Sequence, residues 1–96
     1  MSNITHAEPM SVPFVTEYQR VSGETKEFIM YEGVILSTET AFCSLNTIQG
    51  NIENMVPDQY GSVHARVGHV NGLWEIESTS GLSASANCFV FAKPDA

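Results

Sequence analysis

The stretch AFCSLNTIQG, residues 41–50, decides the fold of this chain together with its counterpart ASANCFVFA, residues 84–92. Each is a short apolar run with the two-residue alternation of a β-strand, and each holds one of the two cysteines, Cys43 and Cys88. The clearest hairpin signal of the sequence lies between them. The sequence therefore predicts one β module over residues 41–92, with the preceding residues attached to it.

The hairpin signal is Asn71-Gly72, the strongest two-residue pattern for a type I′ turn, because both central positions need a positive φ. A turn there sets five cross-strand pairs: Val70 with Leu73, His69 with Trp74, Gly68 with Glu75, Val67 with Ile76, and Arg66 with Glu77. The apolar residues of this register share one face: Val63, Ala65, Val67, Trp74 and Ile76. Arg66 and Glu77 form a charge pair on the other face. We expect His69 to stack on the Trp74 indole or to make a core hydrogen bond, with a ligand or catalytic role as the alternative.

The rest of the chain also indicates strands. Glu27–Tyr31 and Val34–Leu36 are apolar runs between turn signals, and such runs are too short for helices. Leu82–Ala92 is the longest predicted strand, and its small residues suggest close approach of another sheet or another chain. The predicted fold class is all-β: a small antiparallel β-sandwich or barrel-like module with an extended N-terminal arm.

The N-terminal residues form a separate unit in this scheme, with residues 1–20 as the arm and residues 21–96 as the β domain. The arm is broken by prolines, which remove backbone donors and disfavour helix. It is either a disordered tail or an extended segment that lies on a neighbouring subunit. Its apolar anchors favour the second alternative, and the predicted partner-binding residues are Pro9, Pro13, Phe14, Val15 and Tyr18.

Composition limits the classes of function. The 96 residues make one domain, and charged residues are only 16% of them, a low density that suggests a surface covered by other subunits. Eleven acidic residues against four scattered basic ones give a net charge of −7, which argues against nucleic-acid binding. The sequence shows neither a secretion signal nor a membrane-spanning run, so we expect a protein made in a cytoplasm, without a membrane partner.

The two cysteines allow several interpretations. Cys43 and Cys88 form a disulfide if their strands are neighbours, or they are two free buried thiols. A metal site is a weaker alternative because the pair lacks the spacing that zinc needs. A catalytic pair of Cys43 with His64 or His69 would need an exposed, electropositive pocket, which a buried strand of an acidic protein does not provide.

Binding residues are suggested by the longest irregular connection, Asn51–Gly61. This segment is either a covering loop with Ile52, Met55 and Val56 packed inward, or a binding loop that presents Asp58, Gln59 and Tyr60. The candidate ligand surface is Tyr60, His64 and Trp74. No motif of a known catalytic site, cofactor site or metal site is present in the sequence, so we expect neither an enzyme nor a bound cofactor.

A family resemblance is carried by three segments of the C-terminal half. They are Phe42-Cys43-x-Leu45-x-x-Ile48-x-Gly50, then Val63, Val67 and Asn71-Gly72-x-Trp74-x-Ile76, and finally Ser83-Ala84-x-Ala86-x-Cys88. Together they resemble a small cysteine-bracketed β module of phage virion and tail-fibre proteins and of variable pilus-tip adhesins. The chain departs from that pattern at residues 51–60, where a glycine-rich segment is usual, and at Glu75 and Glu77.

The resemblance implies a non-enzymatic phage structural protein that assembles in the host cytoplasm and functions on the virion after lysis. Its partners would be other capsid or tail subunits, and the oxidising exterior would permit a Cys43–Cys88 bridge. Such proteins are often trimers, and the face of Ala84, Ala86 and Cys88 is a candidate three-fold contact. The expected role is capsid decoration or cement through the arm. The alternatives are a tail-fibre or adhesin module that binds a receptor glycan and, in a different class, a cytoplasmic host-directed protein or a small enzyme.

Overall fold

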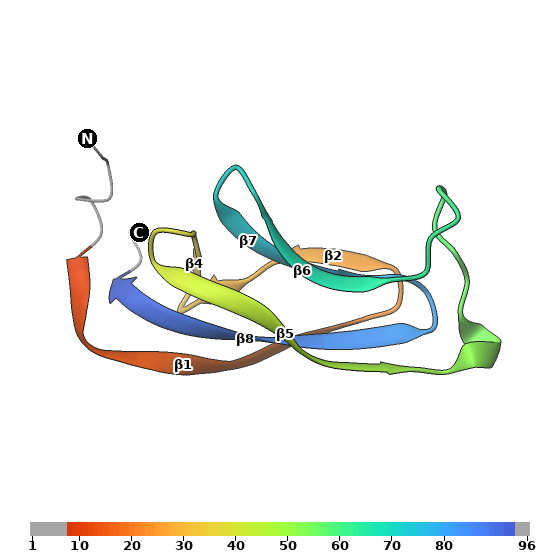
Figure 1. The fold of residues 1–96 in the computed structure, drawn as a ribbon, viewed down its shortest axis with the longest axis horizontal. Coiled ribbons are helices and arrows are strands. Elements are labelled where there is room, and N and C mark those ends of the chain that lie inside the picture. The colour runs from red at the N-terminus through yellow and green to blue at the C-terminus, as the bar shows by residue number, and fades with distance from the viewer. Residues whose placement is uncertain (1–7, 94–96) are drawn as a thin grey trace.

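The computed structural model describes the backbone of residues 8–93 and the side chains of residues 19–93. The described chain is all-β and consists of antiparallel sheets packed together, as the sequence predicted (Figure 1). The elements in chain order are β1 (Glu8–Ser22), β2 (Thr25–Phe28), β3 (Met30–Tyr31), β4 (Val34–Ile35), β5 (Ala41–Gly50), the 3-10 helix η2 (Ile52–Asn54), β6 (Ala65–Val70), β7 (Leu73–Ser78) and β8 (Leu82–Lys93).

The larger sheet has the strand order β1-β8-β5, with the long strand β8 in the centre. The predicted strand over residues 41–50 is confirmed as β5, and the prediction for residues 82–92 is confirmed as β8. In β5 the side chains of Ala41 and Cys43 are buried while those of Phe42 and Ser44 are exposed, so the expected alternation holds through the first half of the strand.

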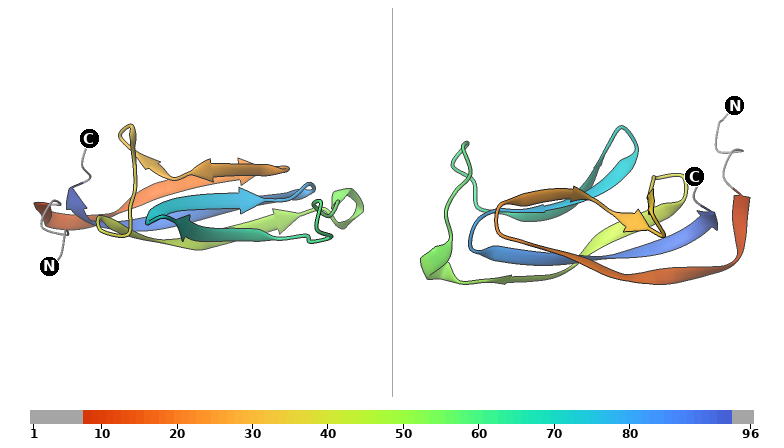
Figure 2. Two further views of the ribbon diagram at one scale, coloured as in Figure 1. Left: turned by 90° about the horizontal axis from the view of Figure 1, so that it is seen from above. Right: turned by 180° about the vertical axis from the view of Figure 1, so that it is seen from behind.

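The smaller sheet has the order β2-β7-β6 and lies over the larger one, as the views in Figure 2 show. Its β6–β7 hairpin has the predicted register, including Arg66 opposite Glu77 and His69 opposite Trp74. Asn71 and Gly72 have φ values of 54° and 78°, which are the left-handed values that a type I′ turn requires. The predicted ring contact is also present, because His69 meets the Trp74 indole edge to face at 5.1 Å between ring centroids.

The core lies between these two three-stranded sheets, and β3 and β4 form a separate two-stranded sheet. Trp74 is buried there, and its indole N–H donates a hydrogen bond of 2.9 Å to the carbonyl of Ala41 in the opposite sheet. The small residues Ala84, Ala86 and Cys88 are each only 1% exposed, because their face of β8 is covered within the chain. The suggested three-fold contact on this face is therefore wrong, since another subunit could reach it only if the sandwich opened.

Cys43 and Cys88 form a disulfide between directly opposed residues of β5 and β8. Their side chains are buried in the core. The disulfide interpretation is thus confirmed, and the interpretations as free thiols, as a metal site and as a catalytic Cys–His pair are wrong for this pair.

The predicted arm is extended, and from Glu8 onward it is a strand of the larger sheet. β1 pairs antiparallel with β8 of the same chain, from Glu8 opposite Lys93 to Ser22 opposite Ser83. The strand continues without a break across the expected domain boundary after residue 20. Residues 1–7 lie outside the described residues, as do the side chains of the predicted partner-binding set: Pro9, Pro13, Phe14, Val15 and Tyr18.

The disulfide should supply a large share of the stability of this small domain. It closes a loop with a sequence separation of 45 residues, which corresponds to about 4 kcal/mol on the chain-entropy model. We expect reduction to lower the free energy of unfolding by about 2–4 kcal/mol in denaturant titrations. A Cys43→Ala/Cys88→Ala variant is the control and should not respond to the reductant. Equal stability of the oxidised and fully reduced protein would contradict this role.

Gly81, between β7 and β8, holds the start of the connection that follows β5 in place. Its carbonyl accepts a hydrogen bond from the N–H of Asn51, and its φ is +89°. A Cβ atom at this position would overlap the Asn54 carbonyl group and would lie 2.6 Å from the Cα of Met55. Only glycine allows the two backbones to approach this closely.

We expect Gly81→Ala to lower the free energy of unfolding by at least about 2 kcal/mol, because left-handed strain adds to backbone overlap. Gly61→Ala is the matched control: its φ is +82°, but nothing lies within 4 Å of the added methyl group. That variant should lose only about 1 kcal/mol. Thermal and urea denaturation measure both, and equal losses would show that the close approach to Asn54 is unimportant.

Candidate functional site

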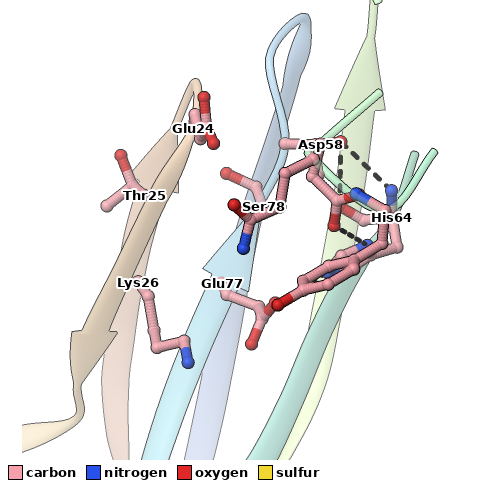
Figure 3. A pocket seen from close by; sticks show the side chains of 10 residues that line it. Glu24, Thr25, Lys26, Asp58, His64, Glu77 and Ser78 are labelled. Carbon is pink, nitrogen blue, oxygen red and sulfur yellow. Dashed lines mark hydrogen bonds and ion pairs between the residues drawn. The ribbon is translucent and has the colours of Figure 1, made fainter. Parts of the chain in front are cut away.

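A pocket of about 260 Å³ opens at one end of the smaller sheet. Figure 3 shows Glu24, Thr25 and Lys26 on one side, Asp58 and His64 on the other, and Glu77 and Ser78 of β7 between them. Because Ile76 points into the core, the neighbouring Glu77 points to the outer face of the sheet, where the pocket lies. The full lining is Glu24, Thr25, Lys26, Asp58, Gln59, Tyr60, His64, Glu77, Ser78 and Thr79.

One wall of the pocket is a tight loop built around Asp58. The Oδ1 atom of Asp58 accepts hydrogen bonds from the backbone N–H groups of Tyr60 at 2.8 Å and Ser62 at 3.0 Å. The backbone N–H of Asp58 donates to the carbonyl of Ser62, and the N–H of Gly61 donates to the carbonyl of Asp58. These bonds close the loop on itself and leave Tyr60 at its tip, where it is 84% exposed.

A chain of polar side chains connects this loop to β7. The Nδ1 atom of His64 lies 2.9 Å from the Ser62 hydroxyl, and its Nε2 atom lies 2.6 Å from Oε2 of Glu77. Oε1 of Glu77 accepts a 2.9 Å bond from Arg66. Because an ionised carboxylate only accepts, Nε2 of His64 donates the bond to Oε2 of Glu77.

Two carboxyl groups of the pocket, those of Asp58 and Glu77, have lowered pKa values. The backbone N–H groups of Ser62 and Tyr60 stabilise the charged form of Asp58 and hold its pKa below the ordinary value. Burial raises the pKa of Glu77, but the hydrogen bond from His64 and the charges of Arg66, His64 and Lys26 outweigh it, so the net shift is downward. Asp58 and Glu77 are therefore ionised at neutral pH.

The connection Ser62–His64–Glu77 has the order of a catalytic triad, but its surroundings do not suit acyl transfer. That chemistry needs free N–H groups to stabilise an oxyanion. Here the N–H groups of Tyr60, Gly61 and Ser62 all donate to Asp58, and that of His64 donates to the Thr79 hydroxyl. These four N–H groups are therefore not available to stabilise an oxyanion.

The structure brings together two of the three predicted ligand residues. Tyr60 and His64 line the same pocket, and the neighbouring Asp58 and Gln59 of the binding-loop alternative line it as well. Trp74 lies apart in the core. The inward packing proposed for the other alternative is wrong for Ile52 and Val56, which are 83% and 56% exposed, whereas Met55 is half-buried.

Sequence reasoning missed the part of the pocket contributed by β2 and β7. It paired Glu77 with Arg66 but did not connect Glu77 to His64. It interpreted Glu24 as a solvated edge or loop residue, with an acidic or divalent-cation site as the alternative, and it gave no role to Thr25 or Lys26. The predicted register of the hairpin could have indicated the contact between His64 and Glu77. Continuing it beyond Ala65, which pairs with Ser78, brings His64 to the end of β7 next to Glu77.

Comparisons with known proteins give no family assignment: no protein-family model, curated protein or solved structure matches the chain. Among the described residues, no cluster of three or more His, Cys, Asp or Glu side chains is placed to hold a metal ion. The part of the chain that the structure describes also contains no helix with the length and hydrophobicity to cross a membrane.

The lowered carboxyl pKa values predict loss of stability in acid. A group whose pKa is lowered on folding stabilises the fold above its unfolded pKa, and this contribution disappears as the pH falls through the folded value. We expect the midpoint of thermal or urea denaturation to decrease when the pH is lowered below about 4. Asp58→Asn keeps the Oδ1 acceptor but cannot titrate there, so its stability should depend less on pH over that range. Glu53→Gln, an equal charge change at an exposed site outside the pocket, should follow the parent curve; identical pH profiles for all three proteins would contradict the assignment.

Proposed function

We propose that this protein is a non-enzymatic structural protein on the surface of a phage particle, of the capsid decoration or cement type. The observation that carries the proposal is the buried Cys43–Cys88 disulfide. A cytoplasmic thiol pool opposes such a bond, whereas the exterior of a released particle preserves it. The bond joins two of the three segments that carry the resemblance to virion modules.

The position of β1 supports attachment through the N-terminal segment. In the order β1-β8-β5 it is an edge strand, so no described strand pairs with the second side of its backbone. An open edge can accept a strand of a neighbouring capsid subunit, a common mode of protein recognition. In this proposal residues 1–20 lie along the neighbouring subunits and residues 21–96 cover the particle surface.

Exposed aromatic residues on the larger sheet support contacts with other subunits. Phe89 and Phe91 have ring centroids 6.4 Å apart, and Phe42 is the cross-strand neighbour of Phe89. All three side chains are more than a third exposed. Apolar groups gathered on one sheet are typical of surfaces that other proteins cover, and a homotrimer on the particle is the arrangement that we favour.

A second candidate function is receptor binding as a tail-fibre or adhesin-type module. The observation that favours it is the pocket in which Tyr60 and His64 meet. The two functions differ in copy number, because a decoration protein covers the head whereas a fibre tip is present in few copies.

The test is quantitative mass spectrometry of purified particles, analysed without reduction. We expect hundreds of copies per particle with the Cys43–Cys88 linkage intact, and we expect a protein that lacks residues 1–13 to be lost from the particles. A few copies would favour the tail or fibre role. Retention of the truncated protein would contradict attachment through the arm, and absence of the full chain from particles would overturn the virion proposal.

A further inference from the structure

The pocket at the end of the smaller sheet combines polar side chains with apolar surface, which is the composition of a site for a small amphipathic ring. Pockets for drug-sized molecules are lined mostly by apolar groups and enclose about 300–1,000 Å³. This one measures about 260 Å³, and apart from Tyr60 its lining consists of charged, hydroxyl, amide and imidazole side chains. The surface that these side chains expose inside the pocket is nevertheless more apolar than polar. Its size suits one small ring, and its lining suits a molecule that combines an apolar face with hydroxyl groups.

Tyr60 supplies the apolar surface that such a ring needs. The phenol is exposed at the loop tip, while the backbone N–H of Tyr60 is fixed by Asp58. An aromatic ring on a backbone that is already ordered loses little conformational entropy on binding. A pyranose ring presents an apolar C–H face and a rim of hydroxyl groups, and a tyrosine can pack against that face while its hydroxyl stays in water.

The polar groups on the two walls of the pocket include both hydrogen-bond donors and acceptors. Asp58 uses Oδ1 for the loop, and its Oδ2 lies 4.0 Å from Nδ1 of His64, so Oδ2 retains capacity to accept hydrogen bonds. Lys26 carries N–H donors on the opposite wall, which β2 forms (Figure 3). Adjacent sugar hydroxyls both donate and accept, so they can bridge two such walls.

Charge restricts the class of sugar. The pocket contains three carboxylates, from Glu24, Asp58 and Glu77, against the ammonium of Lys26, and Arg66 is already paired with Glu77. The whole chain carries a net charge of −7. A carboxylated sugar would meet repulsion both at long range and inside the pocket.

We infer that this pocket binds one ring of a neutral saccharide, with Tyr60 packed on the ring face and with Asp58 and Lys26 holding its hydroxyl groups. The inference deepens the receptor-binding candidate function and depends on it only for the biological source of the sugar. The binding itself is a property of the isolated chain.

The experiment is an amide-resolved NMR titration of the intact, oxidised protein. The probes are the methyl glycosides of glucose, galactose, mannose and N-acetylglucosamine, compared with glucuronic acid and N-acetylneuraminic acid. We expect at least one neutral glycoside to shift the signals of residues 24–26 and 58–64 with a millimolar dissociation constant. The two acidic sugars should leave these signals unchanged at the same concentrations.

Three variants connect the binding to the proposed contacts. Tyr60→Ala should weaken binding roughly two- to tenfold, the range expected for the loss of one ring contact, whereas Tyr60→Phe should retain most of the affinity. Phe89→Ala removes an exposed aromatic side chain from the other sheet and should leave the titration unchanged. An unchanged amide spectrum away from the substituted residue shows that each variant is folded.

Several outcomes would overturn the inference. They are no shift with any neutral glycoside, stronger binding of the acidic sugars, or equal affinity of Tyr60→Ala and the parent protein. The result is independent of the particle analysis. A protein found on particles that binds none of the glycosides would overturn the sugar site alone, and a protein that binds a glycoside but is absent from particles would overturn the virion proposal alone.

Discussion

The covalent bond between Cys43 and Cys88 is the constraint on which the rest of the structure depends. It joins β5 to β8 near the Ala41 end of their ladder, so the register between the two strands cannot slip. With that register fixed, Ala41 faces the smaller sheet, and its carbonyl receives the Trp74 indole N–H. A chain of this length buries a limited core. The disulfide fixes the register within the larger sheet, and the hydrogen bond from Trp74 to Ala41 connects that sheet to the smaller one.

The sequence was most informative where local geometry and the hydrophobic pattern agreed. Asn71-Gly72 requires left-handed backbone, and the alternation around it leaves one register that buries Trp74 and Ile76, so the hairpin could be predicted pair by pair. The structure of the N-terminal segment was harder to predict. Pro9 and Pro13 suggested a segment without ladder pairing, but an edge strand needs only one side of its backbone bonded and can accommodate proline. The pairing of the N-terminal segment with β8 therefore could not be predicted from the local sequence.

The pocket could be predicted only in part, because it depends on how a loop closes. The apolar residues of the loop 51–61 suggested that this loop packs inward. The observed path is instead set by the close approach of Gly81 to Asn54, a contact between backbones nearly thirty residues apart that side-chain patterns do not encode. Once the path is fixed, Asp58 organises the loop through its own backbone bonds, and His64 reaches Glu77. The charge pair of Glu77 with Arg66 was predictable from the register, but its second partner was not.

The central place of β8 in the larger sheet also affects how the chain folds during synthesis. β8 is the last strand to leave the ribosome among those described, yet β1 and β5 both pair with it. The β6–β7 hairpin is local and can form early, whereas the larger sheet must wait until residues 82–93 have emerged. Until then β1 and β5 are unpaired on the nascent chain and Cys43 has no partner thiol. Assembly of the sandwich is therefore a late event, completed in one step when the central strand arrives.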